Sequence, residues 1–113
     1  MNAVNNFDEL KFFAEVKKRP ALFFGKPSLL SLRDQIFGMS YAFSVCNYDN
    51  QFKYFQLFKD WYYRNLPDKN GYACWWNHII YISGGDDTAA FHCFFRIFEQ
   101  YLKDVHNLSL PEI

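Results

Sequence analysis

Apolar residues recur at helical spacing along most of the chain, and turn-forming residues divide this pattern into segments. We therefore predict an all-α fold, with residues 1–113 forming one domain of about five helices and residues 107–113 forming a C-terminal tail. The expected helices are Asn6 (as N-cap, with Glu9 as its capping-box partner) to about Lys18, Ser28 to about Cys46, Gln51 to Arg64, Tyr72 to Ile82, and Asp86 or Asp87 to about Val105.

The predicted helix over residues 28–46 carries two apolar faces. One face has Leu29, Leu32, Ile36, Met39 and Phe43, and the other has Leu30, Phe37, Tyr41 and Val45. A helix that is apolar on most sides is usually buried between others, so we expect this one at the centre of the fold. Gly38 lowers its helix propensity by about 1 kcal/mol relative to Ala, so we expect a neighbouring helix or ring close to its backbone.

The stretch Arg19–Leu29 predicts a bend between the first two long helices. Pro20 and Pro27 disfavour the α conformation at the residues before them, Gly25 can take a positive φ, and Ser28 or Ser31 can cap the next helix. Leu22, Phe23 and Phe24 are too apolar for a solvated loop, so we expect them to press back onto the core. Arg19 either complements the dipole of the first helix or forms a buried salt bridge that fixes the bend.

The last predicted helix has the clearest amphipathic pattern in the chain. Its expected buried stripe is Phe91, Phe94, Phe95, Phe98, Leu102 and Val105, with Cys93, Arg96 and Gln100 facing away. Glu99 and Lys103 have the spacing of an exposed ion pair. The segment before it is ambiguous, because Ile79 to Ile82 favour a strand whereas Trp75, Trp76, Ile79 and Ile80 share one helical face. We predict a helix, since no partner strand is recognisable.

The segment Arg-Pro-Ala-Leu-Phe-Phe-Gly, with Pro27-Ser28-Leu29, Leu32-Arg33, Gly38 and Tyr41-Ala42 after it, resembles a family of small helical bacterial immunity proteins. A Trp-x-x-Ile-type segment of that family is matched by Trp75 or Trp76 with Ile79-Ile80. The resemblance spans residues 7–102 and includes immunity proteins of contact-dependent growth inhibition systems. It implies a protein that binds and neutralises a cognate toxin, and we assign structural roles to Arg19, Pro20, Gly25, Ser28, Gly38, Trp61 and Trp75. Leu22 and Phe23 stand where Met and Tyr are more usual.

Composition adds limits to this prediction. The formal charge is zero, with 12 Lys and Arg against 12 Asp and Glu, which does not indicate general affinity for nucleic acid. Aromatic residues make up 22% of the chain, so they form either a binding face or a Phe-rich core with half-exposed Tyr. Three cysteines without close pairing suggest reduced thiols in a cytoplasmic protein, and residues 1–10 do not resemble a signal peptide. No membrane or cofactor is expected, and the oligomeric state is open.

Two constellations could carry chemistry. Cys74, His78, His92 and Cys93 could hold zinc, or supply a Cys-His nucleophile pair, in a small enzyme or metal-binding accessory protein. The spacing is not that of a zinc finger, and no orienting third group or oxyanion hole is recognisable. Core or interface positions explain these residues better. We therefore predict a protein that is not an enzyme and has no catalytic residue or bound metal.

The predicted partner surface is acidic with aromatic anchors. We expect the toxin domain to be a nuclease and this protein to cover its active site. A nuclease has a basic cleft because it binds phosphates, so an acidic patch would complement it. The residues that combine acidic and aromatic character are Asp68, Tyr72, Asp86, Asp87, Glu99 and Asp104. The alternative is that these carboxylates are helix caps and solvated surface.

Overall fold

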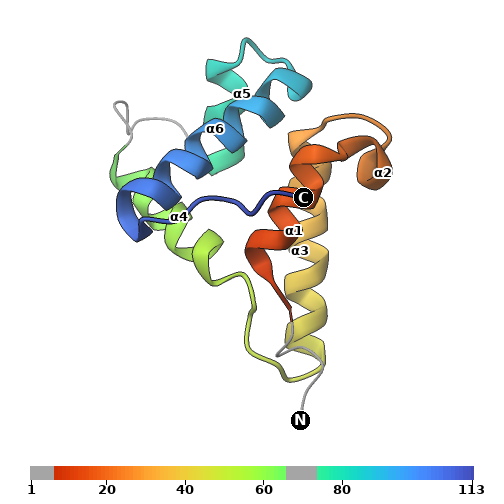
Figure 1. Cartoon of the computed structure of the whole chain (residues 1–113). Coiled ribbons are helices and arrows are strands. Elements are labelled where there is room, and N and C mark those ends of the chain that lie inside the picture. Colours follow the sequence, from red (N-terminus) through yellow and green to blue (C-terminus); the bar gives the residue numbers. More distant parts are fainter. Residues whose placement is uncertain (1–6, 66–73) are drawn as a thin grey trace.

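A computed structural model describes residues 7–65 and 74–113 of the chain. These residues form helices and no strands, which confirms the predicted all-α class (Figure 1). The helices are α1 (Glu9–Lys18), α2 (Pro20–Phe24), α3 (Leu29–Val45), α4 (Lys53–Arg64), α5 (Trp75–Ile82) and α6 (Asp87–His106). The described part of the chain thus has one helix more than predicted, because the Arg19–Leu29 bend itself contains α2. None of these helices combines the length and apolarity needed to cross a bilayer.

Local side-chain capping begins α3 and α6 as the sequence indicates. The side chain of Ser28 accepts a hydrogen bond from the N–H of Ser31 at the start of α3, and Asp86 accepts from Thr88 and Ala89 at the start of α6. The helix predicted for Tyr72 to Ile82 is present as α5, with Tyr72 itself outside the described residues. Its end is followed by Gly84 and Gly85, both at positive φ.

The central helix is α6, so the prediction that residues 28–46 lie at the centre is wrong. Eight residues of α6 are buried, and α6 packs on α3, α4 and α5. In α3 only Leu29, Leu32 and Ile36 are buried, all in its first half. Helix α3 is not central because the described helices pack on one of its faces and leave the other face exposed to solvent.

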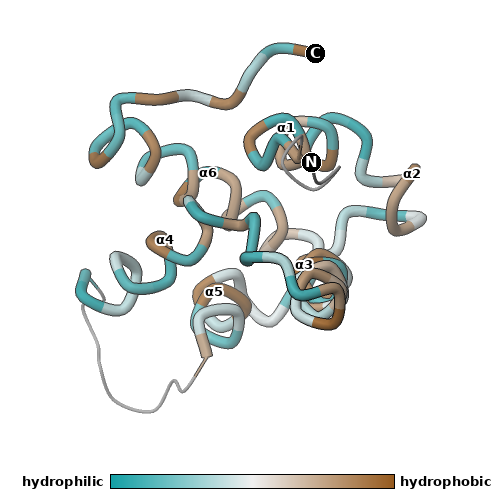
Figure 2. Tube along the Cα trace, turned by 90° about the horizontal axis from the view of Figure 1, so that it is seen from below, coloured by the Kyte–Doolittle hydropathy of each residue, from teal (hydrophilic) through white to brown (hydrophobic). Residues whose placement is uncertain are grey.

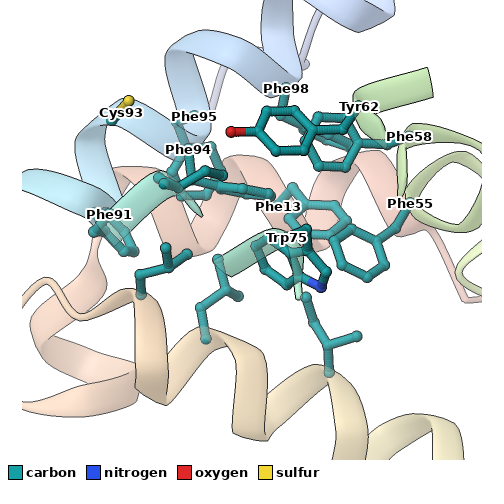
Figure 3. Close-up of a cluster of buried hydrophobic side chains, with 14 of the residues drawn as sticks. Phe13, Phe55, Phe58, Tyr62, Trp75, Phe91, Cys93, Phe94, Phe95 and Phe98 are labelled. Atoms are coloured by element: carbon teal, nitrogen blue, oxygen red, sulfur yellow. The ribbon is translucent and has the colours of Figure 1, made fainter. Parts of the chain in front are cut away.

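The core is built largely from aromatic rings between α1, α4, α5 and α6 (Figure 3). Phe58 lies at its middle, with ring centroids 5.3 Å from Phe98 and 5.6 Å from Phe94. Phe13 of α1 lies 4.7 Å from Phe98, and Trp75 of α5 lies 5.2 Å from Phe55. Tilted and edge-to-face pairs of this kind stabilise a core beyond the area that they bury. Most of the Phe surplus is therefore core.

Details of α6 differ from the predicted face. Cys93 is buried although it was expected to face away, and Val105 is exposed although it was expected in the stripe. Burial on α6 extends beyond the predicted stripe to Cys93 because α3, α4 and α5 all pack on this helix, and Val105 is exposed because it lies near the C-terminal end of the helix. Glu99 pairs with Lys17 of α1, with Nζ and Oε2 2.6 Å apart, in place of the predicted Lys103.

Glu9 begins α1 but caps α4. Its buried carboxylate accepts hydrogen bonds from the backbone N–H of Tyr54 at 2.9 Å and of Phe55 at 2.7 Å. The N-cap residue of α4 makes no side-chain hydrogen bond of its own, so Glu9 supplies the missing acceptors. Asn6, its predicted capping-box partner, lies outside the described residues, and the side chain of Asp8 caps α1 through the N–H of Lys11. Burial raises the pKa of Glu9 to about 7, against the lowering effect of these backbone hydrogen bonds and of Lys53.

The C-terminal tail turns back across the helices (Figure 2). Asn107 ends α6 in the left-handed conformation, and the N–H of Leu108 donates to the carbonyl of Leu102 at 3.0 Å. Leu108 and Leu110 pack against the core, and Nζ of Lys18 in α1 donates to the carbonyl oxygen of Ile113. The tail at 107–113 is therefore part of the packed structure.

Candidate functional site

The Arg19–Leu29 segment forms a short helix between two sharp turns. Arg19 ends α1, and its N–H donates to the carbonyl of Glu15 at 2.9 Å. Pro20 occupies the first position of α2, where its missing N–H costs nothing. Gly25 ends α2 with φ +78°, as predicted. Arg19 is exposed, so the alternative of a buried salt bridge at this position is wrong.

Helix α2 presents apolar side chains to solvent. Leu22 is 78% exposed and Phe23 40% exposed, and α2 has no buried residue. The prediction that all three apolar residues press onto the core is therefore wrong, because only Phe24 packs against it clearly. Consecutive helical residues point about 100° apart, so three in a row cannot face the same way. We refer to Leu22 and Phe23 together as the α2 knob.

The turn that follows α2 is held against the start of α6. Oδ2 of Asp87 accepts a hydrogen bond from the Ser28 hydroxyl at 2.5 Å, and Oδ1 accepts from the N–H of Leu30 at 3.0 Å. The Thr88 hydroxyl donates to the carbonyl of Pro27 at 2.8 Å. These three bonds join the first turns of α3 and α6 just after α2, and α2 itself packs on α1.

Replacing Asp87 with alanine should lower the free energy of unfolding by about 2 kcal/mol, because the Ser28 hydroxyl and the Leu30 N–H lose a charged acceptor. Urea unfolding followed by circular dichroism measures this loss. Asp104→Ala is the matched control, since Asp104 is exposed and accepts one bond from Gln100 of its own helix. Equal stabilities of the two variants would contradict a structural role for Asp87.

The residues of the predicted acidic surface have other contacts where the structure describes them. Asp68 and Tyr72 lie outside the described residues. Asp86 caps α6, Asp87 holds Ser28, Glu99 pairs with Lys17, and Asp104 accepts from Gln100. Asp86 and Asp104 stand about 27 Å apart along α6, given a rise of about 1.5 Å per residue. The described acids thus follow one helix and do not gather in one patch, and their role in binding stays a prediction.

The histidine and cysteine residues do not assemble a site. The Tyr62 hydroxyl and Nδ1 of His78 form a buried hydrogen bond, and burial raises the pKa of that hydroxyl. His92 is exposed while the adjacent Cys93 is buried, as expected for neighbours on a helix. Within residues 7–65 and 74–113, no three His, Cys, Asp or Glu side chains lie close enough together to hold a metal ion. The alternative site of Cys74, His78, His92 and Cys93 gains no support.

Comparisons with known proteins add no relative. No protein-family model, curated protein or solved structure matches the chain. The resemblance of residues 7–102 to immunity proteins therefore stays a prediction from the sequence motifs alone.

Proposed function

We propose that this protein is an immunity protein that binds and neutralises a cognate bacterial toxin domain, and that the α2 knob anchors the complex. The observation that carries the proposal is the exposure of Leu22 and Phe23 on a helix that ends in a rigid turn. Large apolar and aromatic side chains that enter a pocket contribute much of the binding energy at protein interfaces.

The surroundings of α2 favour binding without a large ordering cost. The knob lies on a helix that packs on α1, and the turn after it is held to α6 by the bonds from Asp87 and Thr88, so we expect a small loss of conformational entropy on binding. Arg19 and Lys26 are exposed on either side of the knob. A matching toxin surface would therefore have an apolar pocket with an acidic rim, which suits a region outside a phosphate-binding cleft.

The test is co-expression with the toxin domain encoded beside this gene, followed by measurement of the dissociation constant. Leu22→Gln and Phe23→Ala should each weaken the complex roughly tenfold to a hundredfold, because each removes an apolar anchor. Leu22→Gln should fold as wild type, since the side chain is exposed and Gln suits a helix. Leu57→Gln on α4 is the matched control, because Leu57 is also an exposed apolar residue.

Charge-reversal variants distinguish binding through the α2 knob from binding through the predicted acidic residues of α6. If Glu99→Lys and Asp104→Lys weaken the complex while the α2 variants bind as wild type, the acidic residues of α6 form the interface and the α2 knob does not. If the chain and the neighbouring toxin form no complex, the proposed function itself is wrong.

A further inference from the structure

Helix α3 carries a second exposed apolar surface. Leu30, Phe37, Tyr41 and Val45 are 36%, 48%, 72% and 61% exposed and follow one another along one side of the helix. We call these four residues the α3 stripe. They lie away from Leu29, Leu32 and Ile36, which face the core. Figure 2 shows α3 at the edge of the molecule, with α2 and α5 beside it.

The stripe has the size of a weak interface and no net charge. Its exposed apolar area is roughly 400 Å², within the range of patches that are often functional on monomers. Arg33 and Asp34 are the charged residues of α3, and Nη2 of Arg33 lies 2.8 Å from Oδ1 of Asp34. The surface is therefore neutral, and two copies of it can approach each other without net repulsion.

We propose that two copies of this chain associate through antiparallel packing of their α3 stripes. In an antiparallel helix pair, residues whose numbers have a constant sum lie at the same level. One sum places Leu30 opposite Val45, Asp34 opposite Tyr41, and Phe37 opposite Gly38. Apolar side chains then meet each other at both ends, and the carboxylate of Asp34 meets a tyrosine hydroxyl.

Gly38 leaves room for a side chain of the other copy at the middle of this pair. It is exposed, and a Cβ at this position would meet no atom of the described residues within 4 Å, apart from its chain neighbours and the backbone of its own helix. The neighbour that the sequence predicts beside Gly38 is thus missing from residues 7–65 and 74–113. In the antiparallel pair, the Phe37 ring of the other copy covers this gap. The ring of Phe37 is already oriented by Trp76 of α5, with centroids 5.6 Å apart.

The Asp34–Tyr41 contact is also compatible with the contacts inside one chain. Both hydrogen bonds from Arg33 go to Oδ1 of Asp34, at 3.0 and 2.8 Å, so Oδ2 can accept a bond from the Tyr41 hydroxyl of the other copy. The side chains of Asp34 and Tyr41 are both exposed in the single chain. A pair this small suggests a dissociation constant in roughly the micromolar range.

Sedimentation equilibrium of the purified full chain over a range of concentrations tests the proposal without any other protein. Wild type should reach twice the mass of one chain. Gly38→Gln should raise the dissociation constant at least about tenfold, because its side chain occupies the space for Phe37. The same change should leave helix content intact, since Gln has a higher helix propensity than Gly.

A charge exchange tests the register. Tyr41→Glu should dissociate the pair, because the introduced carboxylate would face Asp34 of the other copy. The double variant Asp34→Lys/Tyr41→Glu should associate again, since each introduced ammonium group would now face an introduced carboxylate. Leu57→Gln on α4 should associate as wild type. A wild-type chain that stays monomeric at its highest soluble concentration overturns the proposal, and so does an assembly that Gly38→Gln and Tyr41→Glu leave unchanged. These outcomes do not depend on the proposed toxin complex, which rests on different residues.

Discussion

Replacing Phe58 with alanine should lower the free energy of unfolding by about 4 kcal/mol. Phe58 is fully buried, and its ring touches the rings of Tyr62, Phe94, Phe98 and Tyr101 from α4 and α6. The variant loses the transfer free energy of the ring and leaves a cavity that rigid aromatic neighbours cannot fill. Urea unfolding monitored by tryptophan fluorescence and by circular dichroism measures the change.

Leu57→Ala is the control for this variant, because Leu57 is the neighbouring residue on α4 and is exposed. It should change the stability by less than about 1 kcal/mol. If Phe58→Ala were no more destabilising than Leu57→Ala, the arrangement of α4 against α6 would be incorrect.

Stability should also fall as the pH rises from about 4.5 to above 7, by up to about 3 kcal/mol through Glu9 alone. Burial raises the pKa of Glu9 to about 7 in the folded protein, from an ordinary value of 4.5. The folded state therefore binds a proton in this pH range that the unfolded state has released. The contribution is complete below pH 4.5 and is lost as the pH rises through 7.

Glu9→Gln isolates this contribution. The single carbonyl oxygen of glutamine can still accept a hydrogen bond from the N–H of Tyr54 or from that of Phe55, and the side chain does not titrate. The difference in free energy of unfolding between wild type and the variant, measured by urea titration at several pH values, should change in favour of the variant as the pH rises. A difference that is constant from about pH 4.5 to 8 would contradict the buried position of Glu9.

Local patterns in the sequence predicted much of the helical framework. The aromatic stripe of α6 and the caps at Ser28 and Asp86 each depend on residues within a few positions of one another. Gly25 was predictable for the same reason, since a left-handed turn is a property of that residue and its neighbours. These features needed no knowledge of which helices meet.

The errors concern burial, which depends on distant segments. The two apolar faces of α3 show that it can be buried, but the number of helices available to cover it decides whether it is. Leu22 and Phe23 were placed in the core because they are apolar. The bend was not expected to contain a helix, in which the step of about 100° between neighbouring residues prevents all three apolar side chains from facing the core. For Glu9, a capping pattern within α1 concealed a longer-range role on α4.

The α2 knob was not predicted as a binding site. The Pro and Gly residues of Arg19–Leu29 predicted a bend with a structural role, whereas the structure exposes Leu22 and Phe23 there. The acids of α6 were predicted as a binding surface from their charge. Asp87 instead holds the turn before α3, a contact between residues 59 positions apart that no local pattern indicates.

The remote cap on α4 bears on the order in which the chain folds. When the capping residue is adjacent to the helix, the first turn and its cap can form together from residues that are close in the sequence. The start of α4 depends on an acceptor 46 positions earlier, and the start of α3 on one 57 positions later. Closing loops of that length costs chain entropy before any contact is gained, and non-local contacts of this kind slow folding. We therefore expect the hydrogen bonds at the first turns of α3 and α4 to be completed late in folding, when distant segments of the chain meet.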